Sequence, residues 1–243
     1  MNIYIKKIKN NPLFQNLTEQ DFNILLEPDA CIVGRYEKKT VIMHEGELCR
    51  SIGFILDGAL SVQQLSPSGE LINIQIFHQG DCFGPALLYA KMPCYPYTLV
   101  TSVPTNVLYI PFSQIETLLK TSMTFNKNYI AFLSNRISIF QKKIRILSEK
   151  EVRSRLILYF SYEFSKAKET SFLLNHTKTE IADMIGVARP SVSRELKHMQ
   201  EDGLIIMERN LITIKEPNIF TLKYNISGMP EVTHPACPIR MWY

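Results

Sequence analysis

Residues 178–205 constrain the fold of this chain more than any other stretch of the sequence. Ile181 and Ile185 are four residues apart, so they share one face of a short helix. Gly186 follows directly and permits a tight turn, because glycine adopts positive φ values at little cost. A second apolar set then recurs at helical spacing, at Val192, Leu196 and Met199. Two short helices joined by a glycine-containing turn predict a helix-turn-helix.

Polar residues near the start of the second helix indicate that this motif binds DNA. A recognition helix presents the side chains of its first turns to base edges in the major groove. Arginine pairs with guanine through its planar fork, and serine bonds to bases or phosphates. Arg189 and Arg194 are therefore candidates for reading bases, and Lys178 for holding a phosphate; the alternative is a structural helix pair with solvated arginines. The full set of expected DNA contacts is Lys178, Thr179, Arg189, Ser191, Ser193, Arg194 and Lys197.

The same stretch resembles the helix-turn-helix of the CRP/FNR family of bacterial transcription regulators. The resemblance rests on TEIA at 179–182, RPSVSR at 189–194 and EDGLI at 201–205. It continues into the apolar alternation LITI at 211–214, which suits a wing strand. It extends over roughly residues 13–224 and implies a homodimer that binds a palindromic operator in double-stranded DNA and contacts RNA polymerase.

Length and charge agree with a globular protein of one large or two ordinary domains. The chain has 243 residues, of which 46% are hydrophobic and 21% are charged. Its net charge of +4 permits nucleic-acid binding without requiring it. Residues 148–227 contain 12 Lys or Arg against 11 Asp or Glu. Any positive potential that faces DNA must therefore come from the placement of the basic residues.

The sequence shows neither a membrane span nor an export signal. No segment reaches the roughly 20 apolar residues that a transmembrane helix needs, and residues 1–12 lack an apolar signal core. We therefore expect a cytoplasmic protein without membrane contact. The five cysteines are Cys31, Cys49, Cys82, Cys94 and Cys237. Because they form no C-x-x-C pair and no metal-ligand spacing, we expect reduced, buried thiols and no metal site.

Short β-rich runs separated by glycine turns occupy residues 31–111. The runs at 32–36, 53–56 and 71–77 have strand composition, and 71–76 alternates large apolar with polar residues as a half-buried strand does. Turn signals recur every eight to twelve residues or so, which favours a small antiparallel barrel or sandwich. The glycine positions also resemble the β-roll of cyclic-nucleotide-binding domains, a jelly-roll-like double-stranded β-helix.

A long apolar stripe follows between residues 112 and 150. Its steps of three and four residues continue over about four heptads, interrupted only at Asn126, and favour a coiled-coil seam. Packing within a single domain is the alternative. We expect this helix to pair with its own copy, as the family resemblance also implies. The predicted dimer contacts are Ile130, Leu133, Ile137, Phe140 and Ile144.

These patterns together predict an α+β fold in four segments. Residues 1–111 form the β-roll sensor, 112–147 the dimerisation helix and 148–227 the winged helix-turn-helix, followed by a tail at 228–243 whose role is open. An amphipathic helix at 148–164 precedes the DNA-reading motif. After Lys215 the chain shows at most a weak final helix.

The sensor segment departs from the family members that bind cyclic nucleotides. Those members carry a Glu that holds the ribose and, further along, an Arg that neutralises the cyclic phosphate. Here Pro85 follows Gly84 where the Glu should stand, and residues 91–103 contain no Arg. A buried phosphate without a cationic partner would cost several kcal/mol. We therefore expect an effector other than a cyclic nucleotide.

The candidate effector pocket has an aromatic character instead. Tyr89, Tyr95 and Tyr97 edge it, with Lys91 as the nearby cation, which suits an aromatic or weakly acidic molecule, or no ligand. Its residues, by resemblance, are Gly84, Ala86, Leu87, Tyr97 and Thr98. An iron–sulfur cluster would need four cysteines, mostly near the N-terminus, and none precedes Cys31. His44 and His78 do not stand where haem-binding relatives place their ligands, so we expect no cofactor.

The sequence thus predicts a homodimeric, sequence-specific transcription regulator whose β-roll biases the dimer helices. Whether it activates or represses stays open. One rival hypothesis is a cyclic-nucleotide-binding regulatory module without a DNA role, which leaves the helix-turn-helix unexplained. The other is an enzyme, which we do not expect, because no Ser-His-Asp, Cys-His or metal-ligand set stands at useful spacing.

Overall fold

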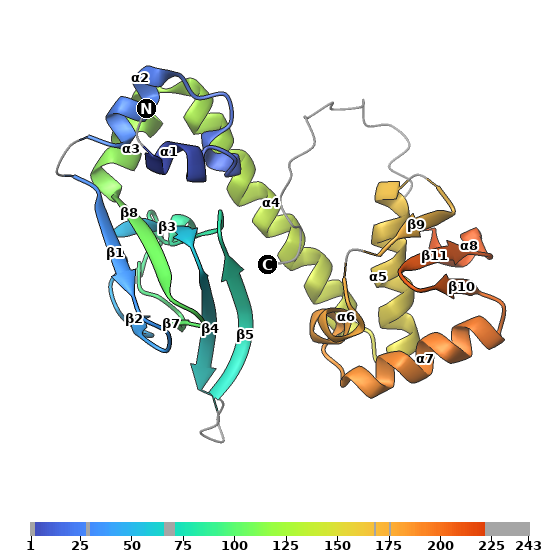
Figure 1. Ribbon diagram of the computed structural model, residues 1–243. Coiled ribbons are helices and arrows are strands. Elements are labelled where there is room, and N and C mark those ends of the chain that lie inside the picture. Colours follow the sequence, from blue (N-terminus) through green and yellow to red (C-terminus); the bar gives the residue numbers. More distant parts are fainter. Residues whose placement is uncertain (1–2, 28–29, 66–70, 168, 175, 222–243) are drawn as a thin grey trace. The chain divides into compact units, whose positions relative to one another are not determined.

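Figure 1 shows the computed structural model of the protein, which describes residues 3–27, 30–65, 71–167, 169–174 and 176–221. The described residues form two compact units, one ending at Asn135 and the other beginning at Arg136. The boundary between the units falls inside a long helix. Our finer division into four segments stays a prediction, and the tail at 228–243 lies outside the described residues.

The first unit contains two four-stranded antiparallel sheets. One has the strand order β1-β8-β3-β6 and the other β2-β7-β4-β5. The strands are β1 (Ile32–Tyr36), β2 (Val41–Met43), β3 (Ser51–Asp57), β4 (Ala59–Leu65), β5 (Leu71–His78), β6 (Cys82–Phe83), β7 (Thr98–Thr101) and β8 (Thr105–Pro111). This arrangement confirms the predicted antiparallel β-roll, and the three expected strands coincide with β1, β3 and β5.

Strand β5 forms as expected, but its apolar residues face outward. Ile72, Ile74 and Ile76 are 50%, 46% and 42% exposed. Phe77 is buried and pairs with the buried Leu60 of β4, and this pairing sets the register of the two strands. Because side chains alternate along a strand, Gln75 shares the inward face with Phe77. The apolar side of the alternation is therefore the outer side, contrary to the usual orientation of a half-buried strand.

Short helices cover one end of the β-roll: α1 (Ile3–Ile8), η1 (Pro12–Phe14) and α2 (Glu19–Leu25). Helix α2 starts after Thr18, because Thr18 Oγ1 accepts a hydrogen bond from Asp21 N at 3.2 Å and the Asp21 carboxylate accepts one from Thr18 N at 2.9 Å. Such a reciprocal pair is a capping box. The ring of Phe14 lies 4.8 Å from that of Phe54 in β3, which ties these helices to the core of the roll.

The predicted long helix is broken into two, α3 (Phe112–Thr121) and α4 (Met123–Ser148). The break lies at Ser122, whose backbone is extended, with φ −114° and ψ 106°. Ser122 Oγ accepts a hydrogen bond from Phe125 N at 3.2 Å and so caps the second helix. Asn126, the expected interruption of the seam, donates to a carbonyl of α3 at 3.0 Å across this break. The expected dimerisation helix at 112–147 therefore consists of two helices, and the break lies four residues before Asn126.

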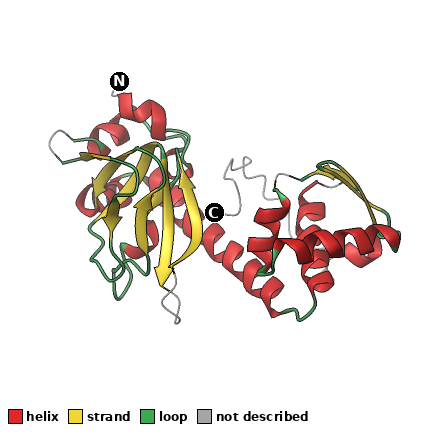
Figure 2. Ribbon diagram, turned by 60° about the horizontal axis from the view of Figure 1, so that its bottom comes forward, coloured by secondary structure: helices red, strands yellow, loops and turns green. Residues whose placement is uncertain are grey.

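The second unit is a helical bundle with a small sheet at its edge (Figure 2). Its elements after α4 are α5 (Val152–Ala167), β9 (Ser171–Leu173), α6 (Lys178–Ile185), α7 (Arg189–Glu201), β10 (Ile205–Glu208), β11 (Leu211–Ile214) and α8 (Pro217–Phe220). The strands pair antiparallel in the order β10-β11-β9. Strands β10 and β11 form the wing, so the predicted α+β fold with a winged helix-turn-helix is confirmed.

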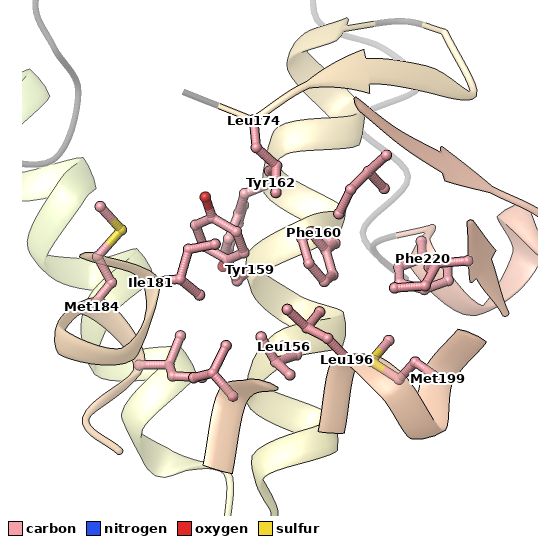
Figure 3. Packing of buried hydrophobic residues seen from close by; sticks show 14 of the residues in the cluster. Leu156, Tyr159, Phe160, Tyr162, Leu174, Ile181, Met184, Leu196, Met199 and Phe220 are labelled. Carbon is pink, nitrogen blue, oxygen red and sulfur yellow. The ribbon is translucent and has the colours of Figure 1, made fainter. Parts of the chain in front are cut away.

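Helix α5 anchors the helix-turn-helix through a continuous apolar core. Figure 3 shows Leu156 and Phe160 of α5 together with Leu196 and Met199 of α7, all buried. The end of α4 contributes Ile146 to the same core. Helices α6 and α7 therefore rest on α5 and on the last turns of α4, and not on each other alone.

Candidate nucleic-acid interface

Two local signals decide where the first helix of the helix-turn-helix begins and ends. Thr177 Oγ1 accepts a hydrogen bond from Glu180 N at 3.2 Å, and the Glu180 carboxylate accepts one from Thr177 N at 2.6 Å. This capping box starts α6. Gly186 ends it in the left-handed region at φ +66°, as expected for the turn. Thr177 lies one residue before the predicted motif, and the Thr-x-x-Glu spacing is the sequence signal for its role as the cap.

Helix α7 separates a buried face from an exposed one. Val192, Leu196 and Met199 are between 0% and 1% exposed and face the core. Pro190 stands in the first turn, where its missing N–H breaks no intrahelical hydrogen bond. Arg194 lies outside the buried stripe and is exposed. One side of α7 is therefore committed to packing, and the other is available to a ligand.

The residues that we expect to contact DNA lie on α6 and α7, outside the buried stripe. Thr179, Arg189, Arg194 and Lys197 are exposed, and Lys178, Ser191 and Ser193 are half-buried. Lys197 Nζ lies 3.4 Å from a carboxylate oxygen of Glu201, in a pair where both side chains are more than half exposed. Exposed pairs of this kind contribute little to stability, so a DNA phosphate can replace the carboxylate at small cost.

An ion-pair cluster fixes α7 against α5. Arg153 Nε lies 2.5 Å from a carboxylate oxygen of Glu195, and Arg153 Nη1 lies 2.6 Å from one of Asp202. The bond to Glu195 raises the pKa of Arg153 above its usual value. Glu195 is inside α7 and Asp202 is its C-terminal cap, so the cluster restrains both the middle and the end of the helix. No local sequence pattern predicts this cluster, because Arg153 and Glu195 are 42 residues apart and meet only in the tertiary fold.

A half-buried histidine stands directly before the capping box of α6. His176 Nδ1 lies 2.9 Å from the hydroxyl oxygen of Tyr159, a fully buried residue of α5. Burial lowers the pKa of His176 below its usual value, and this effect outweighs the opposing influence of Glu163 and Glu180. The folded state therefore favours the neutral imidazole at this position.

Gly84, Ala86 and Leu87 of the expected effector pocket lie in a single turn that is hydrogen-bonded to α4. It consists of η2 (Pro85–Leu87), which Gly84 begins at φ +96°. A Cβ on Gly84 would lie 2.9 Å from the carbonyl oxygen of Ser51, so this position needs glycine for space as well as for conformation. The hydroxyl of Tyr129 in α4 donates to the carbonyl oxygen of Pro85 at 2.6 Å. Pro85 is buried, Ala86 is exposed and Leu87 is half-buried.

Tyrosine side chains pack into the interior of the roll. Tyr95 is 2% exposed, and its hydroxyl oxygen lies 3.1 Å from Cys49 Sγ. The ring of Tyr97 lies 6.2 Å from the ring of Tyr95. Tyr36 and Tyr109 share a hydrogen bond of 3.0 Å between their hydroxyl groups. Burial raises the pKa of Tyr95 and of Tyr109 far above the usual value, so both phenols stay protonated.

The residues expected around the effector divide between this interior and the surface. Tyr95 belongs to the interior, whereas Tyr89 is 67% exposed and Lys91 is exposed as well. Tyr97 is half-buried against the same aromatic cluster. Thr98 Oγ1 accepts a hydrogen bond from Glu45 N at 3.2 Å. Tyr89 and Lys91 therefore lie on the surface and Tyr95 in the interior, and the pocket that we expect them to edge stays a prediction.

Helix α4 carries an apolar stripe that this chain alone leaves exposed. Leu133, one of the expected dimer contacts, is half-buried against the core of the roll. Phe125, Tyr129 and Phe132 face the same core and are buried. The other four expected contacts, which we call the α4 stripe, are Ile130, Ile137, Phe140 and Ile144, exposed by 59%, 58%, 61% and 67%.

Neither a metal-ligand cluster nor a membrane-spanning helix is found among the described residues. No three His, Cys, Asp or Glu side chains gather among them as a metal site would require. Within the same ranges, no helix is both long and apolar enough to span a bilayer. Cys49 and Cys82 are buried, whereas Cys31 and Cys94 are only partly buried, and Cys237 lies outside the described residues.

Comparisons with known proteins match both units. Residues 33–122 match the cyclic nucleotide-binding domain family, and residues 154–219 match the Crp-like helix-turn-helix domain family. The global nitrogen regulator of Nostoc sp. is 25% identical over 192 residues, which cover 76% of this chain and 86% of that protein. The cAMP-activated global transcriptional regulator CRP of Pasteurella multocida is 22% identical over 189 residues, covering 76% and 90%.

Solved structures share the fold at lower identity. A CooA variant from Carboxydothermus hydrogenoformans superimposes with a TM-score of 0.58 and 16% identity, covering 90% of this chain and 95% of that one. The catabolite activator protein of Thermus thermophilus gives a TM-score of 0.51 and 20% identity, covering 86% and 96%.

A β-roll joined through a long helix to a winged helix-turn-helix defines a DNA-binding transcription regulator. With both domain families matched in this order, the chain belongs to the CRP/FNR family of bacterial transcription regulators.

The lowered pKa of His176 predicts a pH-dependent stability. In the unfolded chain this imidazole takes up a proton near pH 6.5, but the folded state does so only at lower pH. Stability is therefore fully present above about pH 6.5 and declines as pH falls below it. His176→Gln keeps a polar partner for Tyr159 but does not titrate. Thermal unfolding measured from pH 5 to pH 8 should show a weaker acid-side decline for this variant; an identical decline in both proteins would contradict the assignment.

Proposed function

We propose that the protein is a cytoplasmic homodimer that places two α7 helices in successive major grooves of a palindromic operator. The α4 stripe supports dimerisation, because four large apolar side chains at heptad-like spacing are left exposed on one helix. The polar residues on the outer face of α7 support base reading. RNA polymerase is the proposed partner at the promoter, as for a regulator of this family.

Base reading and phosphate binding are assigned to different residues in this proposal. Arg194, exposed on α7, would read a base, and Lys178, at the start of α6, would hold a phosphate. The other proposed DNA contacts, Thr179, Arg189, Ser191, Ser193 and Lys197, surround them.

Arg194→Ala should weaken operator binding by about 1–3 kcal/mol and relax specificity at one position in each half-site. Lys178→Ala should weaken all DNA sequences alike and reduce the salt dependence of binding. Fluorescence anisotropy with an operator selected from random duplexes, and with scrambled DNA, measures both effects. If Arg194→Ala loses as much affinity for scrambled DNA as for the operator, Arg194 contacts the backbone instead.

The proposed dimer interface makes a separate prediction about Ile137. In the dimer this side chain would be buried against its symmetry mate, so Ile137→Asp would place a charge in a desolvated seam. We expect the variant to be monomeric by light scattering at micromolar concentration and to lose operator binding. Asn135→Asp is the matched control, because Asn135 is exposed on the same helix and lies on the side opposite the α4 stripe. An Ile137→Asp protein that stays dimeric would refute the proposed seam.

We further propose that the effector is not a cyclic nucleotide, although the relative from Pasteurella multocida is named as cAMP-activated. Pro85 offers no side-chain acceptor for a ribose hydroxyl, and its ring is buried. Residues 91–103 contain no guanidinium, and Lys91 is exposed at the edge of this stretch. A lysine also lacks the planar fork with which arginine holds a phosphate.

Calorimetry tests this proposal directly. Titration of the purified protein with cyclic AMP or cyclic GMP should give no binding isotherm at physiological concentrations, and neither nucleotide should change DNA affinity. A dissociation constant at or below about 10 μM, roughly −7 kcal/mol, would show that the phosphate has found a partner. DNA binding without added nucleotide is the internal control, because it separates loss of effector binding from loss of fold.

The rival hypothesis of a cyclic-nucleotide-binding module without a DNA role is disfavoured by the same observations. It requires the ribose and phosphate contacts that this chain lacks, and it assigns no task to α6 and α7. We likewise propose no enzymatic activity, since the family relatives named above are regulators.

A further inference from the structure

One arginine joins three separate segments of the second unit. Arg155 stands in the first turns of α5 and is half-buried. Its Nε donates to the carbonyl oxygen of Glu149 at 2.9 Å, and its Nη2 reaches that of Leu147 at 3.4 Å. Its Nη1 donates to the carbonyl oxygens of Ile185 at 2.8 Å and Gly186 at 3.2 Å. The end of α4, the connection to α5 and the turn of the helix-turn-helix thus share one guanidinium.

The carbonyls that Arg155 binds belong to two helix C-termini. The last carbonyl groups of a helix have no intrahelical partner and carry partial negative charge. Helix α4 ends at Ser148 and α6 ends at Ile185, so two such ends converge on one side chain. A guanidinium stays charged at every physiological pH and presents its donors in a rigid plane, which allows it to bind both ends together.

Direct packing at the same junction supports this connection independently. A Cβ built on Gly186 would lie 2.7 Å from Leu147 Cδ2 and 3.6 Å from Arg155 Nη1. The last turn of α4 therefore lies against the turn between the two reading helices. Lys150, in the short connection at 149–151, is exposed.

We propose that Arg155 is a positioning residue that locks the helix-turn-helix to the end of α4. In the dimer proposed above, on which this inference rests, α4 then carries the reading helices as one rigid body. The separation and tilt of the two reading helices follow from the pairing of the α4 helices. Arg155 would thus determine which half-site spacing the protein accepts, without touching DNA.

Operators of altered spacing test this inference. The wild-type protein should bind its selected operator at least about tenfold more tightly than versions with one base pair added to or removed from the spacer, since one base pair rotates a half-site by roughly a tenth of a helical turn. Arg155→Lys keeps the charge but loses the planar fork. It should reduce the spacing preference to below about threefold, with affinity for an isolated half-site within about threefold of wild type.

Arg153→Lys is the matched control two residues away. Its partners, Glu195 and Asp202, hold α7 on α5 and do not involve α4. This variant should lower affinity for all spacings by a similar factor and keep their ratio. Leu147→Ala, which removes the packing against Gly186, should relax the spacing preference as Arg155→Lys does.

A second readout does not depend on DNA. Trypsin should cleave after Lys150 about tenfold faster in Arg155→Lys than in the wild type, because cleavage follows the population of the opened connection, and Arg153→Lys should show little change. A wild-type protein that binds all spacings equally would refute the proposed dimeric reading itself. A wild-type spacing preference that Arg155→Lys retains would overturn only the inference about Arg155. An equal loss of affinity for isolated half-sites and full operators in Arg155→Lys would also overturn it, because such a loss indicates that Arg155 only stabilises the fold.

Discussion

Helix α4 has apolar side chains on three faces, and each face meets a different environment. Phe125, Tyr129 and Phe132 are buried in the core of the roll, and Ile146 is buried in the core of the second unit. The α4 stripe occupies a third face and stays exposed in the single chain. A helix that is apolar on more than one face loses stability unless each face is covered. The described residues of this chain cover the first two faces, so we propose that a second copy of the chain covers the third.

Specific hydrogen bonds secure α4 near both of its ends. In the first unit, Tyr129 donates to the carbonyl oxygen of Pro85, so the sensor turn and the helix cannot shift independently without breaking a short bond. In the second unit, Arg155 binds the Leu147 carbonyl and the turn at Gly186. Both contacts involve α4, so we propose this helix as the path between the turn at Pro85 and the helix-turn-helix. Such a path becomes allosteric only if the helix has two stable arrangements.

Local sequence patterns predicted most helices and strands, but they could not predict which of these elements pair or pack in the folded chain. The helix-turn-helix followed from the spacing of Ile181, Ile185 and the turn glycine, because helical periodicity is a local property. The break at Ser122 was missed because the apolar steps continue across it, and a serine cap looks like any other polar residue. The outward isoleucines of β5 were misjudged for a different reason. Alternation shows that two faces differ, but only the pairing of Phe77 with Leu60 decides which face is buried.

At the candidate effector site, residue-by-residue comparison with the family predicts some features of the site but not others. The absence of a ribose acceptor and of a guanidinium could be read from Pro85 and from residues 91–103 alone. The aromatic interior of the roll could not be predicted in this way, because Tyr36, Tyr95 and Tyr109 come from strands or loops far apart in the sequence. The hydroxyl groups of these tyrosines form bonds with one another or with Cys49 and contribute no positive charge. A cyclic phosphate placed among these hydroxyl groups would lose its hydration without gaining positive charge from them, which supports our proposal that the effector is not a cyclic nucleotide.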